Sequence, residues 1–200
     1  MSAPLKIQVI LASTREKRFG DKLARYLFDE LEKRGDVRAE LVDLRDWPLP
    51  FFDAPVAPAS AKGPSSHEIV NLWSAKVREA DGYLVVTPEY NHGYPAVLKN
   101  AIDWLFSEWA KKPVAFASYG NAGGARAIEQ LREVVIEVEL VPLRDAIHLP
   151  LEVYLAVRNE SVPANPELFK PIRDARGVDR VAKVFDALVA YGNALKPLRG

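Results

Sequence analysis

Three side chains suited to phosphate binding follow the first apolar run of the chain. Ser13, Thr14 and Arg15 come directly after Leu5 to Leu11, and an amphipathic helix follows them. A helix N-terminus offers free backbone N–H groups, hydroxyls add donors, and arginine can bind two phosphate oxygens at once. The loop from Ala12 to Gly20 therefore predicts a phosphate site, although a helix cap followed by solvated basic residues is an open alternative.

The sequence of this loop argues against two other kinds of phosphate site. It does not contain G-x-G-x-x-G, which binds the pyrophosphate of a dinucleotide. It also lacks G-x-x-x-x-G-K-[ST], which binds nucleoside triphosphates. A single terminal phosphate fits the loop better.

Two further polar loops follow apolar runs and precede helices. The first connects a strand near residues 83–86 to a helix near Pro95, and it contains Thr87, Pro88, Glu89, Tyr90 and Asn91. The second follows residues 113–118 and contains Ser118, Tyr119, Gly120 and Gly123. Glycine allows the backbone to approach a flat ring closely. Taken singly, each segment is also compatible with an ordinary turn.

The remaining elements determine where these loops lie. Apolar runs predict strands at 5–11, 37–44, 83–86, 113–118 and 141–149, with amphipathic helices between them and after the last. Parallel strands in the order 2-1-3-4-5 would form an α/β sheet with helices on both faces. The loops after the first and third strands would then face one crevice. Residues 45–66 and 159–171 predict irregular segments, and residues 1–200 are expected to form one domain.

Composition excludes several functions. The chain has 200 residues, a formal net charge of +0 and no cysteine, so it shows no general basic character for nucleic-acid binding and no thiolate chemistry. Its three histidines are scattered, which predicts no metal site. No apolar run is long enough to span a bilayer. The expectation is a cytoplasmic protein.

The three loops together resemble the NADPH-dependent FMN reductase family. The similarity includes Thr-Pro-Glu-Tyr-Asn followed by Leu-Lys-Asn-Ala-Ile-Asp-Trp-Leu, and Ser-x-Gly-x-x-Gly-Gly-x-Arg from Ser118 to Arg126. The family's Gly-Ser-x-Arg is present as Ala12-Ser13-Thr14-Arg15. Arg18 stands where a later hydroxyl residue often lies, which leaves its own role open. The similarity covers most of residues 5–149.

This resemblance implies a flavodoxin-like three-layer sandwich and an FMN-dependent NAD(P)H oxidoreductase. Hydride from NADPH or NADH would pass through FMN to a quinone, azo compound, free flavin or metal oxyanion by a ping-pong mechanism. The chemistry belongs to the cofactor, so no catalytic side chain is expected. The amides of Glu89 to Asn91 would stabilise negative charge on the reduced ring. The implied FMN contacts are Ser13, Thr14, Arg15, Arg18, Phe19, Thr87, Pro88, Glu89, Tyr90, Asn91, Ser118, Tyr119, Gly120 and Gly123.

Family members commonly form homodimers or homotetramers. The expected contacts between subunits are aromatic: Tyr94, Trp104, Trp109 and the segment 47–52. Two alternatives remain open at this point. One is a flavodoxin-like electron-transfer or redox-sensing protein that acts on a protein partner; the other is a phosphate-ligand binding protein without flavin.

Overall fold

A parallel β-sheet forms the centre of the computed structural model, which describes residues 3–172 and 177–199. Its main strands are β1 (Leu5–Leu11), β2 (Val37–Asp43), β3 (Gly82–Pro88) and β4 (Pro113–Tyr119). The strand order is β2-β1-β3-β4-β5, and each pairing between these strands is parallel. The predicted strand order is confirmed.

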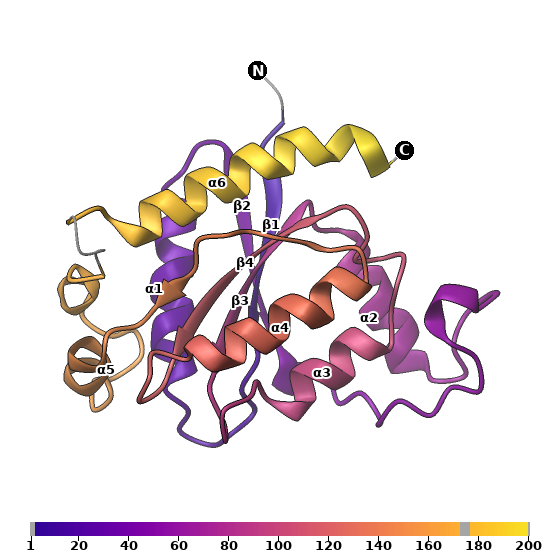
Figure 1. Ribbon diagram of the computed structural model, residues 1–200, viewed down its shortest axis with the longest axis horizontal. Coiled ribbons are helices and arrows are strands. Elements are labelled where there is room, and N and C mark those ends of the chain that lie inside the picture. The colour runs from indigo at the N-terminus through magenta and orange to yellow at the C-terminus, as the bar shows by residue number, and fades with distance from the viewer. Residues whose placement is uncertain (1–2, 173–176, 200) are drawn as a thin grey trace.

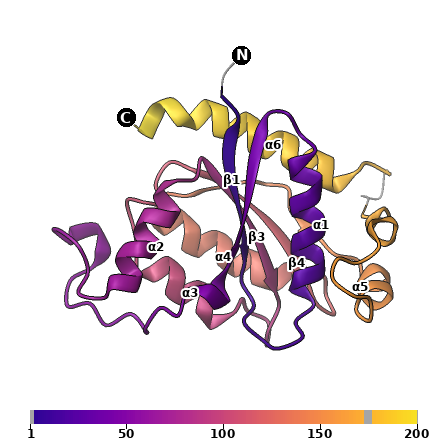
Figure 2. The same ribbon diagram turned by 180° about the vertical axis from the view of Figure 1, so that it is seen from behind.

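Helices cover both faces of this sheet. The described residues include α1 (Gly20–Glu32), α5 (Leu151–Val157) and α6 (Arg180–Leu195), whose apolar side chains pack in one cluster. The other cluster contains side chains of α2 (Glu68–Arg78), α3 (Ala96–Asp103) and α4 (Ala125–Glu137). Figure 1 shows α1 and α5 to the left of the strands and α2 and α3 to the right, and Figure 2 shows the reverse from behind. None of the helices described is long and apolar enough to cross a membrane.

Alternation along the central strands divides the core between the two faces. Ile7 and Val9 on β1 belong to the cluster of α1 and α6, whereas Ile10 belongs to that of α2 to α4. On α1, Leu23 and Leu27 are fully buried, as their helical spacing predicts. Each such leucine contributes about 1.5–3 kcal/mol by leaving water.

The fifth strand differs from the prediction. Instead of one strand over residues 141–149, the structure has β5 (Val141–Pro142) and β6 (Ile147–His148), and both pair with β4. The N–H groups of Val141 and Leu143 donate to the β4 side at 2.9 Å each, to the carbonyls of Lys112 and Val114. The chain then leaves the sheet and returns at Ile147.

The helix boundaries also differ in places. The sequence also predicts Ser65 or Ser66 as the N-cap of the second helix, but α2 begins at Glu68 with His67 as its N-cap residue. The Ser65 hydroxyl instead accepts the His67 N–H at 3.1 Å. Helix α3 begins after Pro95, so Tyr94 lies outside it. Helix α5 is absent from the prediction, because seven residues are too few for a clear helical period.

The irregular segment after β2 is confirmed, with 3-10 turns at Leu44–Asp46 and Pro58–Ser60. Asn100 on α3 fixes it: its side-chain amide donates to the Pro50 carbonyl at 2.8 Å and accepts the Phe52 N–H at 3.0 Å. Phe51 consequently stands 82% exposed. By contrast, Trp104 and Trp109 are buried within the chain, which contradicts the expectation that they contact another subunit.

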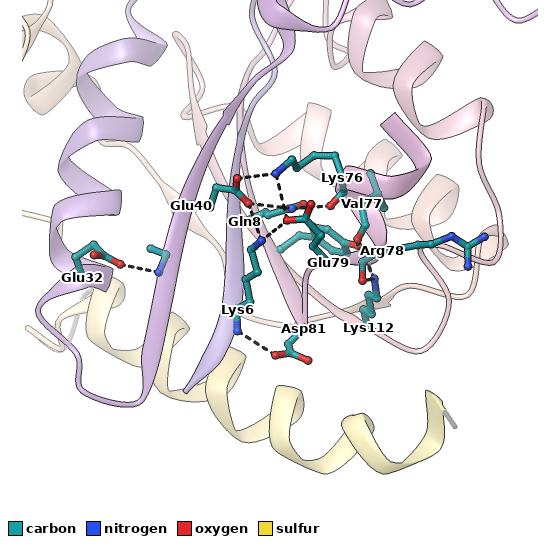
Figure 3. A network of polar contacts seen from close by, with 12 residues as sticks. Lys6, Gln8, Glu32, Glu40, Lys76, Val77, Arg78, Glu79, Asp81 and Lys112 are labelled. Carbon is teal, nitrogen blue, oxygen red and sulfur yellow. Dashed lines mark hydrogen bonds and ion pairs between the residues drawn. The ribbon is translucent and has the colours of Figure 1, made fainter. Parts of the chain in front are cut away.

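A polar network lies at the amino ends of the strands, away from the three loops (Figure 3). Lys76 on α2 binds Glu40 on β2 at 2.8 Å, and the buried Gln8 amide on β1 donates to the Lys76 carbonyl at 2.8 Å. The buried Lys112 ammonium donates to the carbonyls of Val77 and Arg78 at 2.9 and 3.2 Å. It thereby satisfies the C-terminal end of α2.

Lys112 predicts a distinct pH dependence of stability. Burial, with the charge of Arg199, lowers its pKa from the ordinary 10.5 to about 8. Between these two values the unfolded chain binds the proton more tightly, so the free energy of unfolding should rise with pH. Lys112→Met has no titrating group at this position. Relative to this variant, the free energy of unfolding of the wild type should rise by up to about 1.4 kcal/mol per pH unit. Urea unfolding of both proteins from pH 7 to pH 10 measures this. A difference independent of pH would contradict it.

Candidate functional site

A cavity of about 610 Å³ lies at the carboxyl ends of β1, β3 and β4. The loops that form it gather at the lower edge of the molecule in Figures 1 and 2. Parallel strands end at the same edge of a sheet, which is why loops far apart in sequence meet there. Nine of the expected site residues line it: Arg15, Arg18, Phe19, Pro88, Glu89, Tyr90, Asn91, Tyr119 and Gly120.

The other five expected residues do not line the cavity. Ser13, Thr87 and Ser118 are fully buried behind its walls. Their hydroxyls bind other groups of the loops: Ser13 bonds to the Tyr90 hydroxyl at 2.7 Å, and Thr87 donates to the Pro88 carbonyl at 3.0 Å. Thr14 is exposed and Gly123 is half-buried. These residues shape the loops that form the walls.

The first loop leaves its backbone donors free. The N–H groups of residues 14–17 make no hydrogen bond to another described part of the chain. Arg15 is exposed, and its guanidinium lies over the Tyr90 ring at 5.6 Å from the centroid. The loop thus combines free amides and a guanidinium without an ion pair in the described residues, which suits a phosphate.

Arg18 differs from Arg15 because its donors are already occupied. Its guanidinium is 2% exposed and binds the carboxylates of Asp21 and Asp43 and the Ser13 carbonyl. All five N–H bonds are engaged in this way. Burial would lower the pKa of Arg18, but the two carboxylates outweigh it and raise the pKa. Arg18 therefore ties the loop to the end of β2, and this geometry favours a positioning role over direct contact with a ligand.

The second loop contains a tight hairpin. Tyr90 and Gly93 exchange backbone hydrogen bonds at 2.8 and 3.0 Å around Asn91 and His92, whose φ angles are 51° and 70°. Positive φ at both central positions is the geometry of a type I′ turn. The Glu89 N–H donates to the Tyr119 carbonyl at 3.0 Å. Of the three amides expected to stabilise a ligand, only that of Asn91 lacks a partner among the described residues, so the expectation was wrong for Glu89 and Tyr90.

The buried side chain of Glu89 forms an ion pair with Arg126, whose side chain is 43% exposed. The Arg126 Nε donates to Glu89 Oε1 at 2.7 Å, and the carboxylate is 6% exposed. Burial would raise the pKa of Glu89, but the Arg126 guanidinium outweighs it and lowers the pKa below its ordinary value. The carboxylate stays ionised and fixes Arg126 at the cavity wall.

The third loop depends on close packing around Ser118. The Ser118 hydroxyl donates to the Gly123 carbonyl at 2.7 Å, so the ring N–H at His148 Nδ1 donates to Ser118 Oγ at 3.0 Å. A Cβ on Gly124, which has a φ of 76°, would lie 2.5 Å from Ser118 Cβ. Gly120 has a φ of 145°, and its N–H makes no hydrogen bond within the described residues. Glycine is required here both for the backbone angles and for space.

Residues beyond the predicted site complete the cavity. Arg126, Tyr154, Arg158 and Asn159 also line it. The Tyr154 ring packs on Phe19 at a centroid distance of 4.7 Å. The sequence offered no signal for the last three, because they reach the cavity through α5. Arg126 was visible at the end of the glycine-rich motif.

The charge of the cavity favours an anion. Arg15, Lys17 and Arg158 line it and form no ion pair with the described residues, whereas Glu16 is the acidic residue there without a partner. Tyr119 adds a buried hydroxyl that has no hydrogen bond in the described structure, and burial raises its pKa. Free amides, unpaired cations and a glycine wall suit a planar ligand that carries a phosphate.

Known proteins resemble this chain over most of its length. Residues 5–153 match the family model described as NADPH-dependent FMN reductase. An NAD(P)H-dependent FMN reductase of Schizosaccharomyces pombe is 39% identical over 72% of this chain and 74% of its own. A quinone reductase of Escherichia coli K12 is 36% identical over 68% and 72%. The structure of the flavoenzyme NAD(P)H:(acceptor) oxidoreductase FerB from Paracoccus denitrificans superposes with a TM-score of 0.68 at 27% identity, covering 96% of this chain and 98% of that one.

Arg18 provides a test of how the first loop is held. Arg18→Met should lower the free energy of unfolding by about 1–3 kcal/mol, because Asp21 and Asp43 lose their partner, although both are partly exposed to water. Arg15→Met is the matched control, with an expected change of less than about 0.5 kcal/mol. Urea unfolding of the ligand-free proteins at pH 7 measures both, so that any ligand bound through Arg15 does not contribute. Equal stabilities would show that Arg18 does not hold the loop.

Proposed function

The chain belongs to the NADPH-dependent FMN reductase family, and from this membership we propose that it binds FMN in the cavity and reduces small-molecule acceptors with NADPH or NADH. The observation that carries the proposal is the convergence of three loops, with their free amides and cations, on one cavity at the switch point of the sheet. Relatives named as FMN and quinone reductases place the chain among NAD(P)H-dependent reductases.

The described residues suit FMN. We assign the phosphate to the free amides of residues 14–17 and to Arg15, at the start of α1. The isoalloxazine ring would lie against the loops at Pro88 to Asn91 and at Tyr119 to Gly120, where glycine leaves room for it. Ser13, Thr87, Ser118 and Gly123 support these loops from behind, and Arg18 positions the first. Bound FMN would supply the chemistry of accepting a hydride and passing it on.

The protein's own contribution is position and electrostatics. The free amides of Asn91 and Gly120 are available to donate to the polar edge of the ring. The cations Arg15, Lys17 and Arg158 at the cavity attract an anionic nucleotide. No side chain has to form a covalent bond to substrate. We propose quinones, azo compounds, free flavins or metal oxyanions as the acceptor classes.

The oligomeric state, the cellular compartment and the number of domains stay predictions. We propose a homodimer or homotetramer, for which exposed Phe51 is an aromatic contact of the expected kind. We also propose a cytoplasmic location and a single domain over residues 1–200, as the sequence predicts. A flavodoxin-like carrier is the second candidate, since such proteins share this fold; the absence of an acidic cluster around the cavity, among its described lining residues, favours the reductase.

FMN binding tests the assignment of the phosphate. The purified protein should be yellow or take up one FMN, and it should prefer FMN to FAD because the loop suits a single phosphate. Arg15→Ala should weaken FMN binding by about 1.5–3 kcal/mol, the range for a hydrogen bond to a charged group. Lys17→Ala should change it much less. Fluorescence titration measures both, and an unchanged dissociation constant for Arg15→Ala would remove this residue from the phosphate site.

Stopped-flow spectroscopy tests the reaction. NADPH alone should bleach the flavin of the wild-type holoenzyme. In steady-state measurements, double-reciprocal plots of rate against NADPH at several acceptor concentrations should give parallel lines, because NADPH and acceptor would use one cavity in turn. High acceptor should inhibit competitively against NADPH. If the oxidised flavin persists until a second protein is added, the carrier hypothesis is correct instead.

A further inference from the structure

The side chain of His92 lines the cavity and is held by Arg126. Its Nε2 lies 2.9 Å from Arg126 Nη1. A guanidinium has N–H donors and no acceptor, so Nε2 must accept this hydrogen bond through its lone pair. The imidazole is therefore neutral, and its one proton is on Nδ1.

Groups from two elements keep this ring in place. Glu89, directly after β3, holds Arg126 through an ion pair, and Arg126 on α4 holds the ring. Gln130, one turn further along α4, donates to the His92 carbonyl at 3.2 Å. The charged groups that face His92 are thus Arg126 and, behind it, Glu89. The αL backbone at His92 is closed by the hairpin of Tyr90 and Gly93.

The remaining donor of the ring has no protein partner. His92 Nδ1 makes no hydrogen bond to any described residue, and the side chain is exposed at the cavity. A neutral imidazole gives up its proton only to a very strong base, but it donates a hydrogen bond readily. The ring can therefore donate a hydrogen bond to an oxygen atom of a ligand. It suits a ligand whose polar groups accept hydrogen bonds and do not donate them.

We propose that His92 is a substrate-orienting residue whose Nδ1–H donates to a carbonyl oxygen of a quinone acceptor. The inference rests on the proposed function and narrows it: among the acceptor classes, it favours those that present a carbonyl oxygen over azo compounds. No proton is transferred from the ring, so the Glu89–Arg126–His92 arrangement is unchanged when the product leaves.

Nitrogen NMR of the oxidised holoenzyme tests the donor directly, without turnover. The three histidines are labelled with ¹⁵N, and His92→Asn identifies the signals of His92. We expect the proton on Nδ1, and we expect a larger shift of that signal with menadione than with azobenzene, because a carbonyl oxygen accepts a hydrogen bond more strongly than an azo nitrogen does. The absence of cysteine prevents capture of the quinone by a thiol. A proton on Nε2, or no shift with menadione, would overturn the proposal.

Paired variants test the role in acceptor choice. His92→Leu removes the donor, whereas His92→Asn keeps an N–H and tolerates the αL backbone. For His92→Leu, kcat/KM for menadione relative to that for an azo dye without oxygen should fall about 3- to 10-fold, the range for one neutral hydrogen bond. His92→Asn should restore most of the ratio. The control is His67→Leu, since His67 lies outside the cavity lining and contacts Asp53.

These outcomes distinguish a failure of the proposed role of His92 from a failure of the proposed reductase function. If the ratio is the same in His92→Leu and the wild type, His92 does not orient the quinone. If NADPH fails to bleach the flavin of the wild type, the proposed function fails, whereas the proton position on His92 is measured independently of that reaction.

Discussion

The parallel pairing of β1 with β3 is the constraint on which the rest of the site depends. Five residue pairs, from Ile7 with Gly82 to Leu11 with Val86, hold these two strands in register. The register continues past the strands, where the Ala12 N–H donates to the Val86 carbonyl at 3.0 Å. A slip of one residue would turn every side chain to the opposite face and separate the loops. Because the strands end together, Arg15 and Tyr90 approach each other although 75 positions separate them.

Each loop at this edge is closed by its own side chains or backbone, and each leaves donors unused. Arg18 holds the first, the Tyr90–Gly93 hairpin forms the second, and Ser118 with His148 closes the third. These contacts occupy the Ser13 and Gly123 carbonyls and the carboxylates of Asp21 and Asp43. The N–H groups of residues 14–17, Asn91 and Gly120 have no partner within the described residues. A preorganised set of donors needs little rearrangement to bind an anionic ligand, which lowers the entropic cost of binding.

Charge is distributed differently at the two ends of the sheet. At the amino ends, Lys6, Glu40, Lys76 and Glu79 pair with one another, so the network is nearly neutral and structural. At the carboxyl ends, Arg18 pairs with Asp43 and Arg126 pairs with Glu89, whereas Arg15, Lys17 and Arg158 form no ion pair within the described residues. The end of the molecule that contains the cavity therefore differs from the other end in that some of its charged side chains lack an ion-pair partner among the described residues. Paired charges at that end, such as those of Arg126, act by positioning neighbours.

The sequence alone predicted strands β1 to β4, the strand order and the three loops that form most of the cavity. Apolar runs, helical spacing and the polar residues after each run are local patterns, and Thr87 to Asn91 and Ser118 to Gly123 could be read from them. Tertiary structure decided which of these residues face the cavity. The burial of Ser13 and Thr87, the use of all five donors of Arg18 and the occupied amides of Glu89 and Tyr90 depend on partners distant in sequence or on turn geometry. It also decided the contribution of α5 and the proton position on His92, since both result from packing between segments that no local pattern relates.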